Sequence, residues 1–102
     1  MEKMFWLKAI SEKKQRKITK RDGSEGVISW HDLILTNGLD TIIGESSENL
    51  TNLIDSTDDN LRLDINVDDC YMCRFTLTVV PYEKNGVTSN FMKCIIHQMV
   101  RV

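Results

Sequence analysis

Four residues in the last third of the sequence have the spacing of a zinc site. Cys70 and Cys73 are separated by two residues, and so are Cys94 and His97, which gives the letter pattern of a Cys₃His centre. The spacers are Tyr-Met and Ile-Ile, without the glycine that usually accompanies a tight zinc-binding turn. The spacing alone therefore does not predict a metal site. Whether the four side chains can meet at one ion depends on the secondary structure of the segment.

That segment is expected to form one long β-hairpin. Asn85-Gly86 stands between two runs rich in Val, Ile, Thr, Phe and Tyr, which is the strongest short-range hairpin signal. With a two-residue turn, residues whose numbers sum to 171 lie opposite one another, so Cys94 faces Leu77 and is roughly 13 Å along the strands from Cys73. This separation argues against a shared zinc ion and against a disulfide. We expect no metal or other cofactor and three reduced cysteines.

The two faces of this hairpin differ in chemistry because side chains alternate along a strand. One face is apolar and is expected to lie in the core: Cys73, Phe75, Leu77, Val79, Met92, Cys94 and Ile96. The other is polar, basic and aromatic, with Arg74 opposite His97: Arg74, Thr76, Thr78, Tyr82, Phe91, Lys93, His97 and Arg101. This second face fits a binding surface and an ordinary solvated surface equally well.

Residues for catalysis are scarce. His31 precedes Asp32, but neighbours in a strand point to opposite faces and do not form a dyad. The sequence has no GxSxG, phosphate-binding glycine loop or HExxH motif, and the acidic residues Asp55, Asp58, Asp59 and Asp64 lack the spacing of a calcium loop. We do not expect an enzyme.

Charge is unevenly distributed along the chain. The 102 residues, enough for a single domain (1–102), carry a formal net charge of −2. Residues 1–21 nevertheless hold eight lysines and arginines, whereas residues 40–69 hold nine carboxylates and only Arg62. No apolar run could span a membrane and no signal peptide is recognisable, so a cytoplasmic protein without membrane association is expected.

Basic and aromatic residues favour single-stranded nucleic acid as a partner, because such a strand needs cations for its phosphates and flat rings for its bases. The candidate phosphate contacts are Lys13, Lys14, Arg16, Lys17, Lys20 and Arg21 in a basic loop, with Arg74 and Lys93 on the hairpin. The candidate stacking residues are Trp30, Tyr82 and Phe91. Alternatively, the basic run is only a solvated loop and Trp30 packs in the core, as we expect for Trp6.

The remaining elements follow from periodicity and turn residues. Strands are expected at residues 3–10, 27–36 and 39–44, with residues 13–21 looping between the first two. Ser46 and Ser47 supply a helix N-cap, and apolar residues at helical spacing predict a helix over residues 47–56. Strict alternation predicts a further strand over residues 61–67.

This order of elements, three strands, a helix and a final hairpin, resembles that of OB-fold single-stranded-DNA-binding proteins. Trp30-His31-Asp32-Leu33-Ile34-Leu35 resembles their Trp-His-x-Val-Val-Leu strand, in which the tryptophan stacks on bases. The resemblance implies a small OB-like Greek-key barrel. In such a barrel the loops after the first and fourth strands, here the basic run and residues 82–90, flank the binding surface.

The sequence thus predicts an all-β fold with one short helix, an OB-like Greek-key barrel of five to six strands closed by a long C-terminal hairpin. The expected function is non-catalytic binding of single-stranded DNA or RNA, by a protein that forms homo-oligomers. The alternative is a protein-interaction or self-assembly module, in which Phe91, Ile95 and Met99 would be buried at a subunit contact.

Overall fold

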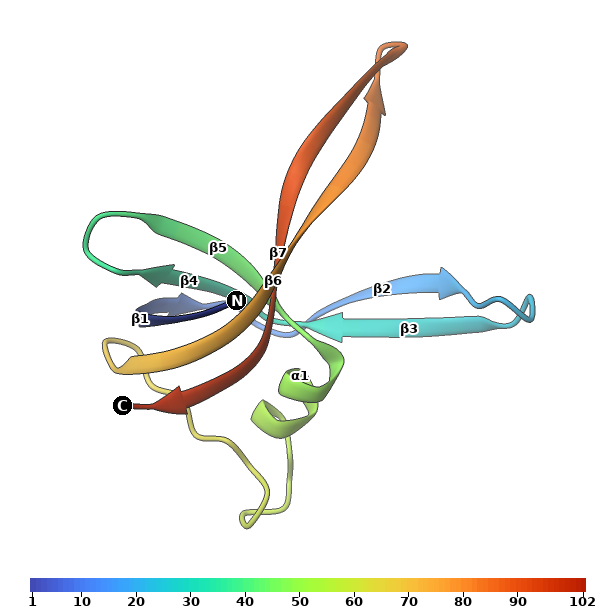
Figure 1. The fold of residues 1–102 in the computed structure, drawn as a ribbon. Helices are drawn as coiled ribbons and strands as arrows, with labels where there is room; N and C mark the ends of the chain where they lie inside the picture. Colours follow the sequence, from blue (N-terminus) through green and yellow to red (C-terminus); the bar gives the residue numbers. More distant parts are fainter.

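The structure, a computed structural model, describes all 102 residues as seven strands and one helix (Figure 1). In chain order the elements are β1 (Glu2–Ile10), β2 (Lys14–Thr19), β3 (Glu25–Trp30), β4 (Asp32–Thr36), β5 (Thr41–Ser46), α1 (Glu48–Ile54), β6 (Cys70–Lys84) and β7 (Val87–Arg101). No helix is both long and apolar enough to cross a membrane.

Five of the strands pair in a ring with the order β1-β4-β5-β7-β6. All neighbours are antiparallel except β5 and β7, which run parallel over three residue pairs, Gly44 with Cys94 to Ser46 with Ile96. A Cβ atom on Gly44 would lie 2.8 Å from Ile96 Cγ1, so a glycine is needed where these strands meet. The ring confirms the predicted fold class as an all-β arrangement with one short helix.

The core lies inside this ring and is built by alternate residues of its strands. The buried apolar side chains are Phe5, Leu7, Leu33, Leu35, Leu50, Tyr71, Cys73, Phe75, Cys94, Ile96 and Met99. On β1, Phe5 and Leu7 point inward, whereas Trp6 is 45% exposed. The prediction that Trp6 is a core residue was wrong, because a single-layered ring buries only one face of each strand.

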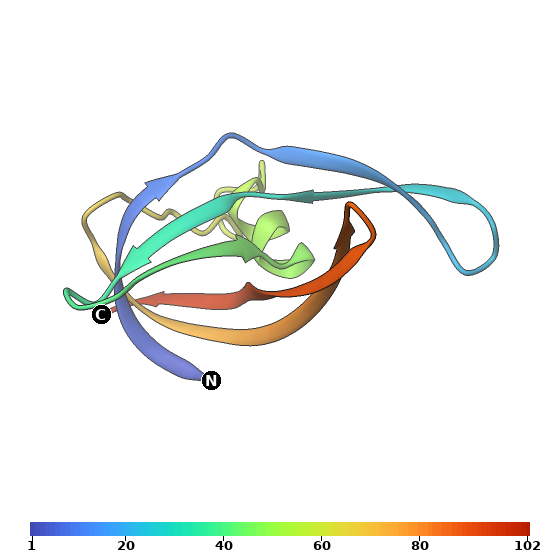
Figure 2. The same cartoon turned by 90° about the horizontal axis from the view of Figure 1, so that it is seen from above.

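The remaining strands, β2 and β3, form a separate two-stranded sheet, called here the β2–β3 arm (residues 14–30), which projects from the ring (Figures 1 and 2). Three of the six basic residues expected in a loop, Lys14, Arg16 and Lys17, thus lie in strand β2, which pairs with β3 from Lys14–Trp30 to Thr19–Glu25. The single strand predicted over residues 27–36 is divided at His31, with β3 in the arm and β4 in the ring. Periodicity did not reveal this division because both parts are β structure.

The long hairpin turns at Asn85 and Gly86, both with positive φ, as predicted. Residues whose numbers sum to 171 pair from Lys84–Val87 to Phe75–Ile96. A bulge then shifts the register, so Arg74 pairs with Gln98 and not with His97 as predicted.

The outer part of this hairpin, called here the β6–β7 arm (residues 77–92), extends beyond the ring in a direction different from that of the β2–β3 arm (Figure 1). Core positions were predicted for Leu77, Val79 and Met92, but all three are exposed. No other element lies over this part of the hairpin, so alternation does not place one face in a core.

Helix α1 begins at the predicted N-cap, where Ser47 Oγ accepts a hydrogen bond from the Leu50 amide. The following strand predicted over residues 61–67 is absent. Leu63 and Ile65 do pack against the core, but their segment has no strand partner, and its hydrogen bonds include one from the Leu63 amide to the Leu53 carbonyl. Alternating burial here reflects an extended segment that covers the barrel.

Candidate nucleic-acid interface

A cleft of about 470 Å³ lies between the β2–β3 arm, the outer wall formed by β5 and β7, and the first turns of α1. Its apolar surface comes from both sides, with Ile28 and Trp30 on the arm and Ile95 on the wall. Lysines from three parts of the chain line it: Lys13 before β2, Lys20 after β2, and Lys93 on β7. The fold thus brings four of the predicted site residues, Lys13, Lys20, Trp30 and Lys93, to one concave surface.

Trp30 stands at the base of the arm in a partly buried position. Its indole Nε1 donates a hydrogen bond to Asp32 Oδ1 over 3.1 Å, and Lys14 Nζ forms an ion pair with the other oxygen, Oδ2, of that carboxylate. Asp32 therefore orients the Trp30 indole and also forms an ion pair with Lys14, a residue predicted to contact phosphate. Part of the ring remains accessible in the cleft.

The other predicted residues lie outside the cleft. Arg16, Lys17 and Arg21 are exposed on the β2–β3 arm, and Arg74 is exposed on β6 where it pairs with Glu2 of β1. Tyr82 and Phe91 are exposed on the β6–β7 arm and contact each other edge to face, with ring centroids 5.7 Å apart. The predicted residues outside the cleft thus lie in three separate exposed places: the β2–β3 arm, the ring part of β6 at Arg74, and the β6–β7 arm.

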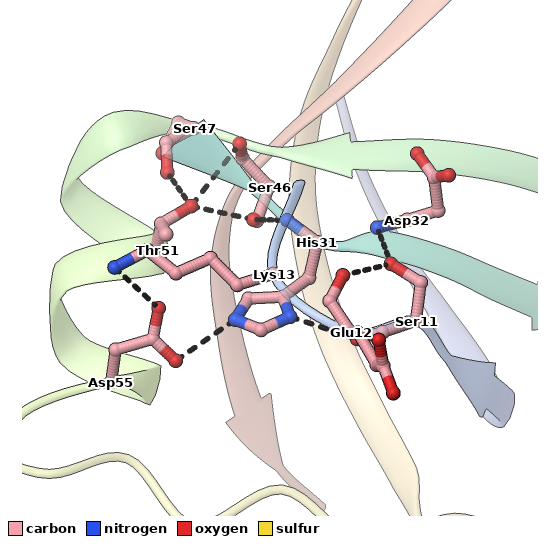
Figure 3. A network of polar contacts seen from close by, with 9 residues as sticks. All are labelled: Ser11, Glu12, Lys13, His31, Asp32, Ser46, Ser47, Thr51 and Asp55. Carbon is pink, nitrogen blue, oxygen red and sulfur yellow. Dashed lines mark hydrogen bonds and ion pairs between the residues drawn. The ribbon is translucent and has the colours of Figure 1, made fainter. Parts of the chain in front are cut away.

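A network of polar contacts joins the base of the β2–β3 arm to the ring and to α1 (Figure 3). His31, between β3 and β4, is buried, and both of its ring nitrogens face acceptors: Nδ1 lies 2.9 Å from the Ser11 carbonyl oxygen and Nε2 lies 2.9 Å from Asp55 Oδ1. Asp55 Oδ2 also lies 3.8 Å from Lys13 Nζ. One carboxylate thus contacts both chain segments that lead into the arm.

Hydroxyl groups complete this network. The His31 amide donates to Ser46 Oγ over 2.8 Å, and Ser46 Oγ lies 2.6 Å from Thr51 Oγ1, which donates to the Ser47 carbonyl. On the other side of the base, the Asp32 amide donates to Ser11 Oγ. The hydroxyls contact backbone and one another, and neither ring nitrogen of His31 faces one. The network therefore lacks the contact between base and nucleophile that acyl transfer requires.

None of the three cysteines lines this cleft. Cys73 and Cys94 are buried and Cys70 is partly buried, all as free thiols. Burial raises the pKa of the Cys73 thiol to about 12, with a further contribution from Cys70 and Cys94, and burial also raises the pKa of Cys94. Cys94 pairs with Leu77 as predicted, and no group of three or more His, Cys, Asp or Glu side chains is placed to hold a metal ion.

Several residues of the cleft were not identified from the sequence. Glu45 contacts Lys93 on the wall, and Ile28, Ile95 and Ser47 contribute further lining. Glu45 and Lys93 meet through the parallel contact of β5 with β7, and Asp55 reaches His31 from the end of α1. Contacts between residues so far apart in the sequence cannot be predicted from a local pattern. The position of the helix, in contrast, was predicted from its N-cap.

Comparisons with protein-family models, with curated proteins and with solved structures find no match for this chain.

Proposed function

We propose that this protein binds single-stranded nucleic acid without catalysing a reaction. The observation that carries the proposal is the cleft itself, in which three lysines surround an accessible tryptophan and an apolar surface. Single-strand binding needs a positive groove along the backbone and aromatic faces for the bases, and the cleft combines both. Both ring nitrogens of His31 face acceptors of the chain itself, the Ser11 carbonyl and the Asp55 carboxylate, so the proposed mechanism gives this histidine no contact with the strand.

In the proposed mechanism, Lys13 and Lys20 contact phosphates and Trp30 stacks on a base, while Lys93, which is paired with Glu45, adds a hydrogen-bond donor on the wall of the cleft. The exposed cations of the β2–β3 arm, Arg16, Lys17 and Arg21, with Lys14 at its base, attract the strand over a longer distance, which salt screens. Arg74, Tyr82 and Phe91 would contact only a strand that continues along β6 and β7. The cleft is thus the primary contact and the hairpin a secondary one.

The test is a fluorescence-anisotropy titration of labelled oligo-dT, about 30 nucleotides long, which exceeds the site size of one OB-type domain. Affinity is expected to fall steeply between about 50 and 200 mM salt through counterion release. Replacing two cleft lysines (Lys13→Gln with Lys20→Gln) should weaken binding on the order of tenfold at the lower salt and reduce the salt slope by about 1.4, since each single-strand phosphate contact contributes about 0.7.

The matched control removes the same charge elsewhere, by Lys3→Gln with Lys84→Gln, both exposed and outside the cleft. It should leave the affinity within about twofold and the slope nearly unchanged, because distant exposed charges are screened. Absence of binding at low salt, or equal losses in both variants, would contradict the proposal.

The β6–β7 arm favours a second candidate function, a protein-interaction or self-assembly module. This arm exposes a larger apolar surface than is usual for a solvated hairpin. The exposed side chains are Leu77, Val79, Tyr82, Phe91 and Met92. The subunit contact expected from the sequence cannot include Met99, however, because Met99 is buried in the core of its own ring. Sedimentation velocity of the protein and of a Val79→Lys/Met92→Lys variant tests whether this arm mediates self-association.

A further inference from the structure

An acid and a base stand side by side on the wall of the cleft, across from the arm that carries Trp30. Glu45 of β5 and Lys93 of β7 form an ion pair, with 3.1 Å between Oε2 and Nζ, and their side chains are 31% and 29% exposed. The parallel pairing of Glu45 with Ile95 positions both strands. The pair is therefore held by the backbone of the ring and remains accessible to a ligand.

A carboxylate in this position does not help to bind phosphate. It repels the strand's backbone and neutralises one of the three lysines of the cleft. A partly exposed ion pair also contributes little to the free energy of unfolding, so stability gives little reason for it. A group that carries donors and an acceptor next to each other, in contrast, can bind the pair as a whole.

Among the nucleic-acid bases, guanine presents this arrangement. Its Watson–Crick edge has two neighbouring donors, N1–H and N2–H, beside the O6 acceptor, so a carboxylate can accept both donors while an ammonium group donates to O6. Adenine and cytosine offer one amino donor beside a ring-nitrogen acceptor. In thymine or uracil a single N–H lies between two carbonyl oxygens, which a carboxylate repels. Proteins read single-stranded bases through these edges while an aromatic ring stacks on the face.

We infer that the cleft prefers guanine at one nucleotide position, with the base stacked on Trp30 and its Watson–Crick edge on Glu45 and Lys93. This inference rests on the proposed function and specifies its ligand. Ile28 and Ile95 provide an apolar surrounding, in which such hydrogen bonds are stronger than in water. The preference is local, since the rest of the strand is bound through phosphates.

The experiment compares oligo-dT with the same oligomer carrying one central guanine, inosine or adenine, each titrated against the full chain by competition anisotropy. A single guanine avoids guanine-rich structures in the probe. Guanine should bind about tenfold tighter than adenine at that position, the usual discrimination of one bidentate contact. Inosine, which lacks only the N2 amino group, should lose most of this gain.

The variant Glu45→Gln should abolish the guanine preference, because it replaces one of the two carboxylate acceptors, and it should strengthen the binding of oligo-dT, because it removes a negative charge from the cleft. Glu48→Gln, a carboxylate of the same cleft that does not pair with Lys93, is the matched control and should keep the preference. Thermal unfolding followed by circular dichroism confirms that both variants are folded.

Equal affinities for the guanine, inosine and adenine oligomers, with oligo-dT still bound, would overturn this inference and leave the proposed function intact. Failure to bind any oligomer would overturn both. A preference that survives in Glu45→Gln would also overturn the assignment of Glu45, because the base would then be read elsewhere.

Discussion

The two arms of this molecule are both two-stranded extensions of one ring, but they differ in chemistry and in attachment. The β2–β3 arm is basic, and a network around His31 and Asp55 joins its base to the ring and to α1 (Figure 3). The β6–β7 arm is the continuation of two ring strands and carries exposed apolar and aromatic side chains.

This difference indicates how each arm obtains its position. The strands of the β6–β7 arm are oriented by their own hydrogen bonds, which continue into the ring. The β2–β3 arm leaves the ring through residues 11–13 and His31, so its angle depends on side-chain contacts at its base. The cleft lies under the arm whose angle is set in this way, and its width therefore depends on those polar contacts.

The largest effect is expected from comparing two residues of β6, one in the ring and one in the β6–β7 arm. Phe75 and Leu77 are on the same face of β6, but Phe75 is 4% exposed and Leu77 is 44% exposed. Phe75→Ala should lower the free energy of unfolding by about 3–5 kcal/mol. Leu77→Ala should lower it by less than about 1 kcal/mol. Urea denaturation measures both, and a large loss in Leu77→Ala would show that the β6–β7 arm is packed against a partner.

A smaller effect is expected from a substitution at the base of the β2–β3 arm, which should affect that arm and not the β6–β7 arm. His31→Ala removes two buried polar contacts and should destabilise the protein by about 2–3 kcal/mol. Amide hydrogen exchange should accelerate in β2 and β3 and remain unchanged in the β6–β7 arm (residues 77–92), because only the β2–β3 arm depends on this side chain.

The matched control for that change is His97→Ala, which removes an exposed imidazole bonded to Thr76. Stability should then change by no more than about 0.5 kcal/mol. Uniform acceleration of exchange in both arms of His31→Ala would mean that the network stabilises the whole ring and does not specifically orient the β2–β3 arm.

The smallest effect concerns the ring part of the hairpin at high pH. Because the pKa of Cys73 is raised from 9.0 to about 12 on folding, the unfolded chain ionises first. The stabilising contribution is complete below pH 9 and is lost as pH rises from 9 towards 12, at up to about 1 kcal/mol per pH unit. Urea denaturation between pH 8 and 10.5 measures this loss. Cys73→Ala should show a shallower decline, and identical slopes would contradict the assignment.

Local signals in the sequence predicted much of the fold. Asn85-Gly86 gave the hairpin register as far as Phe75, and Ser47 gave the start of α1, because turns and caps depend on neighbouring residues. The bulge beyond Phe75 and the division at His31 depend on how the strands curve into a ring. The strand expected over residues 61–67 failed because alternation reports burial and not pairing.

The candidate site was predictable only in part. Lysines near residue 20 and Trp30 were identified from composition, and the fold places Lys13, Lys20, Trp30 and Lys93 around one cleft. Tyr82 and Phe91 were assigned to the same surface because the length of the β6–β7 arm beyond the ring was unknown. Glu45 was not identified, since its partner is 48 positions later in the sequence.

The three parallel residue pairs between β5 and β7 have a consequence for synthesis of the chain. Residues 44–46 and 94–96 are about 50 positions apart, and β1 pairs with β6, which is also synthesised late. The ring therefore cannot be completed while the ribosome is still making the second half of the chain. Until then, β1 and β5 expose unpaired edges on which another chain can add a strand. The interval between translation of β5 and of β7 is therefore when this protein is most exposed to aggregation and most dependent on chaperones.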